Sequence, residues 1–285
     1  MISPNPIVRD PDFGRKRASL GGRMLFFAAA WAIVLVPFLL WRSDWLSGGL
    51  TESELGQYLQ DQQTPRHVQH ALGQVSERMA EHDPTVARWY PDLVRLASSP
   101  LEEIRNTDAW IMGQDTSRPE FHQALLAMLN DPSPLVRGNA AVSLVAFGDD
   151  AGRQQLRQML QPAKVAAPQA GRVIDLATAG TAIRQTAAIA RLQTTGGTIQ
   201  VRAPIPGRVR ALAVQRGASV QAGSELAMID PGPAQVWEAL HALAQVGRKE
   251  DLPLIAPYQT TPASFPEKVR QQAAETERAI LERGR

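Results

Sequence analysis

Residues 201–230, VRAPIPGRVRALAVQRGASVQAGSELAMID, decide how this chain is interpreted, because most of their pattern occurs twice. An upstream copy within residues 167–192 keeps the same order: Ala-Pro, Gly, Val, Leu, Gly, a β-branched residue and two aliphatic residues. The offset is 36 residues up to the leucine and 37 from the second glycine onward, so the second copy carries one inserted residue near Gln215. The duplication predicts two equivalent units within residues 164–230.

The composition of each copy is typical of short β-strands separated by turns. Gly171 and Gly207 follow an Ala-Pro pair, where a turn needs backbone freedom before a strand begins. Gly180 and Gly217 fall between apolar runs, as turn glycines do. One copy is too small to bury its own apolar face, so we expect the two copies to cover each other as a small sandwich.

This duplicated segment resembles the biotinyl/lipoyl-like barrel-sandwich hybrid domain, in the form found in periplasmic adaptor (membrane-fusion) proteins of efflux and secretion systems. In a carrier of this family, a modifiable lysine lies at the hairpin between the two halves. The corresponding link here, residues 193–198, is QTTGGT and holds no lysine; the lysine of the segment is Lys164, at its start. We therefore expect no biotin or lipoate, and no other cofactor. Adaptors usually insert a long helical hairpin at this link, and the short turn here speaks against docking on an outer-membrane channel.

The composition limits the chemistry that the chain can perform. It has no cysteine, which excludes disulfides, thiolate catalysis and cysteine metal sites. It has no zinc-protease, nucleophile-elbow, phosphate-loop or EF-hand motif. The basic residues of the duplicated segment lack interleaved aromatic side chains, so we expect no nucleic-acid binding. We predict that the protein is not an enzyme, with no catalytic, cofactor-binding or metal-binding residues.

The first residues predict a membrane anchor. Residues 1–22 are polar and basic and are interpreted as a cytoplasmic tail, and residues 23–42 as a transmembrane helix. The uncharged run 24–41 would span about 27 Å as a helix, close to the thickness of a bilayer core. Five basic residues precede it, which predicts a single-pass inner (plasma) membrane protein with its bulk in the periplasm. A cleaved signal peptide is the alternative.

Helical periodicity begins at Thr51, and residues 51–163 contain a second internal repeat. Ile104-Arg105 and Ala109 match Val136-Arg137 and Ala141 at a spacing of 32 residues. This pattern resembles short HEAT repeats, including those of bilin-lyase-like proteins, and we expect it to resume over residues 234–285. The resemblance implies structural pairing between the repeat arginines (Arg105, Arg137 and Arg270) and acidic loop residues such as Asp115 and Asp150.

Candidate binding residues are few. Trp89 and Trp110 could line a groove, although core packing is the simpler interpretation. Four basic residues could contact an acidic partner or lipid headgroups, although a solvated strand face would also explain them: Arg202, Arg208, Arg210 and Arg216. His67 and His70 share one helix face and could bind a metal ion only with a third ligand, so solvated polar residues are the preferred interpretation.

The sequence thus predicts a multi-domain α and β protein with an N-terminal transmembrane helix, a HEAT-like α-solenoid and an inserted all-β barrel-sandwich hybrid at residues 164–231. The predicted function is a periplasmic scaffold or adaptor with protein partners in the cell envelope, accessory to an efflux or secretion complex. Two alternatives stay open: an assembly subunit of a membrane enzyme complex, and a cofactor-handling protein related to lyases or carriers. Homo-oligomer formation is also open.

Overall fold

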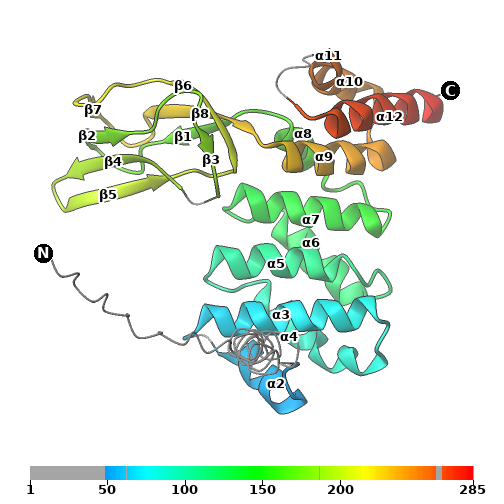
Figure 1. Ribbon diagram of the computed structural model, residues 1–285. Helices are drawn as coiled ribbons and strands as arrows, with labels where there is room; N and C mark the ends of the chain where they lie inside the picture. Colours follow the sequence, from blue (N-terminus) through cyan, green and yellow to red (C-terminus); the bar gives the residue numbers. More distant parts are fainter. Residues whose placement is uncertain (1–48, 62, 186, 261–264, 285) are drawn as a thin grey trace, which may run out of the picture. The chain divides into compact units, whose positions relative to one another are not determined.

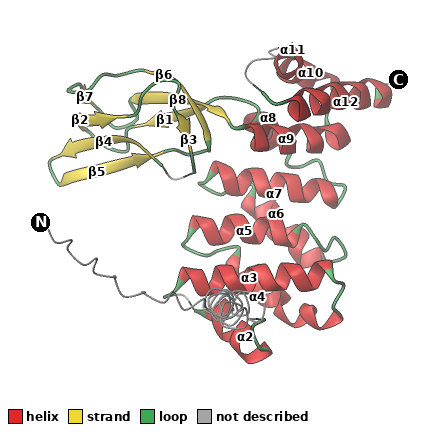
Figure 2. Ribbon diagram, viewed as in Figure 1, coloured by secondary structure: helices red, strands yellow, loops and turns green. Residues whose placement is uncertain are grey.

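The computed structural model describes residues 49–61, 63–185, 187–260 and 265–284. Residues 51–285 form one compact unit of helices and two small β-sheets (Figures 1 and 2). The predicted cytoplasmic tail, residues 1–22, and the predicted transmembrane segment, residues 23–42, lie outside the described residues. In the part that is described, no helix is both long enough and apolar enough to cross a membrane.

The first half of this unit is helical, and its helix starts are encoded locally. Thr51 and Glu54 form the capping box expected from the sequence, and Ser133 caps a later helix by accepting from the backbone N–H of Leu135. The helices are α2 (Glu52–Gln60), α3 (Pro65–Ala80), η1 (Pro84–Trp89), α4 (Tyr90–Leu96), α5 (Glu102–Met112), α6 (Pro119–Met128), α7 (Pro134–Ala146) and α8 (Arg153–Met159).

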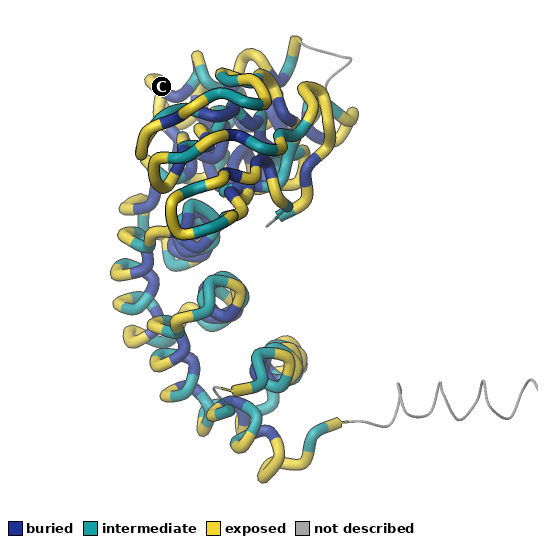
Figure 3. Tube along the Cα trace, turned by 90° about the vertical axis from the view of Figure 1, so that its left-hand side faces the viewer, coloured by how far each residue is buried: buried dark blue, intermediate teal, exposed yellow. Residues whose placement is uncertain are grey.

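The helical repeat of the sequence is also a repeat of buried positions. Ile104 and Val136 are equivalent and both buried, as are Ala109 and Ala141. Helices α3, α5 and α7 lie one above another in Figure 1, and α5 contacts both neighbours. Figure 3 shows that each helix buries one side and exposes the other, as stacked amphipathic helices do.

The repeat arginines are structural, but their partners differ from those expected. Arg105 forms a bidentate pair with Asp131, with N–O distances of 2.6 and 3.0 Å, and not with Asp115. Arg137 donates to the main-chain oxygen of Asp131 at 2.6 Å. Asp115 instead accepts from the hydroxyl of Tyr90 at 2.8 Å. The partner is set by how the loops between helices fold, which the repeat spacing does not encode.

The duplicated segment folds into two four-stranded antiparallel sheets. The strands are β1 (Ala163–Ala166), β2 (Gly171–Leu176), β3 (Ala182–Ile183), β4 (Ala188–Thr194), β5 (Gly197–Arg202), β6 (Gly207–Leu212), β7 (Ser219–Val220) and β8 (Glu225–Pro231). The strand orders are β1-β8-β6-β3 and β5-β4-β2-β7. Strands β1 to β4 of the first copy correspond, in order, to β5 to β8 of the second copy. Exchanging the corresponding strands turns the order of one sheet into the order of the other. Each copy therefore supplies two strands to each sheet.

Glycines hold two different roles in this segment. Gly180 and Gly217 have φ of +82° and +93°, which confirms the predicted turn glycines. Gly207 was predicted to provide backbone freedom for a turn, but the structure requires glycine there because a side chain would have no room. A Cβ atom built on it would lie 1.8 Å from the carbonyl oxygen of Asp230, because β6 and β8 approach closely there.

The chain returns to helices after the second copy. These are α9 (Pro233–Val246), η2 (Lys249–Asp251), α10 (Leu252–Ile255), α11 (Pro257–Thr260) and α12 (Glu267–Arg283). One hydrophobic core joins Leu156 and Met159 of α8 to Val236 and Leu240 of α9. Helices on the two sides of the β segment therefore share a core although about 70 residues separate them.

These observations correct the predicted fold class, which is wrong. The described chain has no helix that could cross a membrane, and residues 51–285 are one compact unit of mixed α and β structure with two small antiparallel sheets. The error has a physical cause. The sequence interpretation treated helices and strands as separate domains, whereas they pack into one unit, in which Leu135 of α7 contacts the β core.

Candidate functional site

The four predicted basic residues do not form one patch. Arg208 and Arg210 lie on β6, Arg202 ends β5 in the other sheet, and Arg216 lies in the turn before β7. Arg210 donates to Asp230 at 2.6 Å, and Arg208 donates to the carbonyl oxygen of Gly180. The structure therefore brings together only Arg208 and Arg210, and both already have partners within the fold.

Arg208 and Arg210 border a hollow of about 670 Å³ between β6, β8 and the segment around α11. Its walls are largely apolar, with Ile183, Tyr258 and Phe265 among them. The hydroxyl of Tyr258 donates to the carbonyl oxygen of Leu160, and burial raises the pKa of this phenol to about 12. Tyr258 is therefore neutral at physiological pH and acts here as a structural donor.

The two candidate tryptophans occupy different environments. The ring of Trp89 packs against Gly56 of α2, so that a Cβ atom on Gly56 would lie 2.9 Å from it. Its indole Nε1 is buried without a hydrogen-bond partner among the described residues. Trp110 lies on α5 with 54% of its surface exposed. Packing against α2 therefore explains the half-buried Trp89 and does not explain Trp110.

Polar side chains near Trp110 along α5 form hydrogen bonds with the neighbouring helices. The Thr107 hydroxyl donates to Gln69 of α3 at 3.1 Å. The Asn139 amide of α7 donates to Asn106 at 3.1 Å. These bonds fix the positions of the side chains that flank Trp110 along α5.

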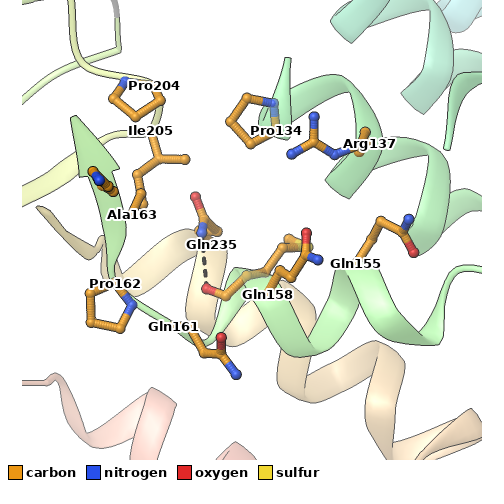
Figure 4. Close-up of a pocket in the computed structure, with 12 residues that line it drawn as sticks. Pro134, Arg137, Gln155, Gln158, Gln161, Pro162, Ala163, Pro204, Ile205 and Gln235 are labelled. Atoms are coloured by element: carbon orange, nitrogen blue, oxygen red, sulfur yellow. Dashed lines mark hydrogen bonds between the residues drawn. The ribbon is translucent and has the colours of Figure 1, made fainter. Parts of the chain in front are cut away.

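A second hollow, of about 280 Å³, lies where α7, α8 and α9 meet the β segment, and we call it the junction cleft. Figure 4 shows Gln235 at its centre, with Pro134 and Arg137 on one side and Ala163 and Ile205 on the other. The lining residues are Pro134, Arg137, Gln155, Gln158, Met159, Gln161, Pro162, Ala163, Lys164, Pro204, Ile205 and Gln235.

Two glutamines in the junction cleft have unpaired oxygens. The amide nitrogen of Gln235 donates to the carbonyl oxygen of Met159 at 2.9 Å, and that of Gln155 to the carbonyl oxygen of Leu129 at 3.3 Å. A carbonyl only accepts, so both amides must turn their nitrogen toward it. The Oε1 atoms of Gln155 and Gln235 are left buried without a partner among the described residues.

The charge in the junction cleft is positive. Arg137 and Lys164 line it, and none of its described lining residues is Asp or Glu. The Nη1 of Arg137 donates to the carbonyl oxygens of Asp131 and Pro132 at 2.6 and 3.0 Å, which fixes the guanidinium. Lys164 lies 3.9 Å from Glu225 at an exposed position.

The sequence interpretation missed this cleft. Gln155 and Gln235 come from helices on either side of the β segment, and an amide side chain belongs to no chemical motif. No sequence signal marks it; the structure reveals it at the start of α9, where Gln235 is only 9% exposed, which is unusual for glutamine.

The histidine pair gives no metal site in the described structure. The Nδ1 of His67 lies 2.6 Å from Asp61, and its ring stacks on Tyr58 at 4.1 Å. The ring of His70 lies 6.3 Å from that of Tyr58. Across the described ranges, no three His, Asp or Glu side chains are grouped as metal ligands.

Comparison with known proteins gives one family and one weak structural likeness. Residues 90–170 match the family model for HEAT repeats. No curated protein matches the chain. Among 33 similar chains of solved structures is one described as "Structure and function of a single-chain, multi-domain long-chain acyl-coa carboxylase", with 22% identity and a TM-score of 0.24. The match covers 34% of this chain and only 10% of that chain. Together with the stacked helices described above, the family match shows that residues 90–170 contain HEAT repeats.

Proposed function

We propose that this protein is a non-enzymatic scaffold that binds a partner protein through its HEAT repeats, on the surface around Trp110. The observation that carries the proposal is the exposure of Trp110, 54%, beside polar side chains that bond between helices. HEAT repeats commonly present such extended surfaces to other proteins. The predicted role of Trp110 in partner binding thus becomes the centre of the proposal.

The energetics favour a protein partner. A tryptophan side chain offers about 150–250 Å² of contact area, and burying the exposed half is worth about 2 kcal/mol. Tryptophan is enriched among the few residues that dominate interface affinity. Asn106 and Thr107, which precede Trp110 by one turn of α5, are uncharged, so covering these two side chains desolvates no charge.

The neighbouring side chains also reduce the entropic cost of association. Thr107 and Gln69 are already bonded to each other, as are Asn106 and Asn139. Side chains that are fixed before binding lose little rotamer freedom when a partner covers them. The surface is therefore arranged for a partner before the partner arrives.

Site-specific photo-crosslinking tests this proposal. A photoreactive amino acid at position 110, in the full chain within its native cells, is expected to give one defined crosslinked partner. Leu281 on α12 provides a matched control, because it is the other exposed large hydrophobic residue among those described, at 40%. A partner captured equally from position 281, or none from position 110, would contradict the proposal.

The identity of the crosslinked protein also separates the finer predictions. An efflux or secretion component would support the accessory adaptor, and a subunit of a membrane enzyme would support the assembly subunit. Capture of a second copy of this chain would support a homo-oligomer. The predicted periplasmic location depends on residues outside the described part and stays a prediction.

A further inference from the structure

The junction cleft has the features of a ligand site that is separate from the surface around Trp110. We propose that it binds the carboxy-terminal end of a polypeptide, with the terminal carboxylate at Arg137 and the last backbone N–H groups at Gln235 and Gln155. The ligand chemistry is thus a carboxylate with an N–H donor beside it.

The unpaired glutamine oxygens can accept hydrogen bonds from a ligand. Gln235 is 9% exposed, and a buried acceptor that lacks a partner costs about 1–3 kcal/mol. A ligand that presents N–H groups recovers this free energy on binding. The backbone of a peptide carries one such donor per residue other than proline, so it supplies donors to both glutamines.

The cations of the cleft require an acceptor or anion on the same ligand. Arg137 is held by two main-chain carbonyls, so its remaining N–H donors are fixed in direction. A guanidinium binds a carboxylate strongly and directionally. Lys164 also lines the cleft, although its charge is shared with Glu225 at 3.9 Å, so Arg137 is the main cation for the carboxylate.

The size of the cleft limits what enters. About 280 Å³ lies just below the range of sites for drug-sized ligands, so only the end of a chain fits. The apolar side chains of Pro134, Met159 and Ile205 can contact the last side chain of that chain end. Capture of a terminal carboxylate is an established mode of peptide recognition.

The test is a calorimetric titration of the full chain with three probes: N-acetyl-alanyl-alanine, its carboxamide, and free alanine. The acid is expected to bind, and the carboxamide at least about tenfold more weakly, because it lacks the charge that Arg137 recognises. Free alanine is expected to bind more weakly than the acid, because it lacks the amide that Gln235 recognises. Equal binding of acid and carboxamide, tighter binding of alanine, or no binding of the acid at millimolar concentration would overturn the proposal.

Variants locate the site. Arg137→Gln and Gln155→Met are each expected to weaken binding of the acid by about tenfold or more. Arg210→Gln serves as the matched control, because it removes one arginine from the neighbouring hollow and leaves the cleft intact. Thermal unfolding of each variant identifies any that fails to fold, and Gln155→Met tests the site independently of Arg137. A loss in Arg210→Gln equal to that in Arg137→Gln would overturn the assignment.

The test of the junction cleft is independent of the test of the surface around Trp110. Trp110→Ala is expected to bind the dipeptide acid as the unchanged chain does, because Trp110 does not line the cleft. If crosslinking at position 110 finds no partner, the titration still tests the cleft. A Trp110→Ala variant that loses the dipeptide would contradict the assignment to the cleft.

Discussion

Arg153 and Asp251 are 98 residues apart in the chain and are joined by two hydrogen bonds of 2.8 and 2.9 Å. Arg153 begins α8, before the β segment, and Asp251 ends η2, after it. The carboxylate of Asp251 is fully buried and also accepts from the backbone N–H of Arg248. This pair therefore connects the helices that the β segment separates in the sequence.

Replacing Arg153 should strongly destabilise the unit. In Arg153→Met, the buried carboxylate of Asp251 loses its bidentate partner. Among the described residues it keeps the charged side chain of Arg157, at 3.3 Å, and the backbone N–H of Arg248. Breaking a buried pair from one side costs about 3–5 kcal/mol. Urea denaturation should show a loss near that size. Arg191→Met is the control, because its pair with Asp175 is exposed and worth at most about 1 kcal/mol. Equal losses in both variants would contradict a special role for the buried pair.

Asp108 makes stability depend on pH. Burial raises the pKa of this carboxyl well above its ordinary value, although the charge of Arg95 opposes the shift. The unfolded chain releases the proton above about pH 4, whereas the folded chain keeps it, so folding binds a proton in that range. The free energy of unfolding therefore falls as the pH rises above about 4, by up to about 1.4 kcal/mol per pH unit. The fall ends where the Asp108 carboxyl loses its proton in the folded chain as well.

Asp108→Asn should remove this dependence. The variant should gain stability over the unchanged chain progressively as the pH rises above about 4, until Asp108 titrates in the folded chain, as measured by urea denaturation at each pH. Asp175→Asn is the control, because the side-chain hydrogen bond from Arg191 lowers the pKa of that exposed carboxyl. A stability difference between Asp108→Asn and the unchanged chain that stays constant with pH would contradict the expectation.

Two glycines should respond in opposite directions to alanine. Gly207→Ala places a methyl group 1.8 Å from the carbonyl oxygen of Asp230, so β6 and β8 must separate. The expected loss is about 3 kcal/mol or more. Gly73 lies inside α3, and a methyl group there meets no atom within 4 Å. Gly73→Ala should therefore stabilise the chain by about 0.5–1 kcal/mol. Thermal unfolding compares both, and a gain in Gly207→Ala would be incompatible with the close strand approach.

The sequence was informative where structure repeats and uninformative where distant segments meet. The matching of Ile104 with Val136 predicted stacked helices because burial on a helix follows its own period. The partner of Arg105 was not predictable, since Asp131 reaches it through the fold of a loop. The junction cleft could not be found either, because Gln155 and Gln235 meet only after the β segment has folded between them.

The sequence also did not distinguish the environments of the two tryptophans, Trp89 and Trp110. Trp89 is half-buried and packs on Gly56, so Trp89→Ala should cost about 2–3 kcal/mol of stability. Trp110 is 54% exposed, so Trp110→Ala should change stability much less, by about 0.5 kcal/mol. Partner affinity should show the reverse order, with Trp110→Ala weakening it by about 2 kcal/mol or more. Urea denaturation measures the first quantity, and titration with the partner identified by crosslinking measures the second. If Trp110→Ala destabilised the fold as much as Trp89→Ala, Trp110 would be a packing residue, and its exposure would no longer support a binding surface.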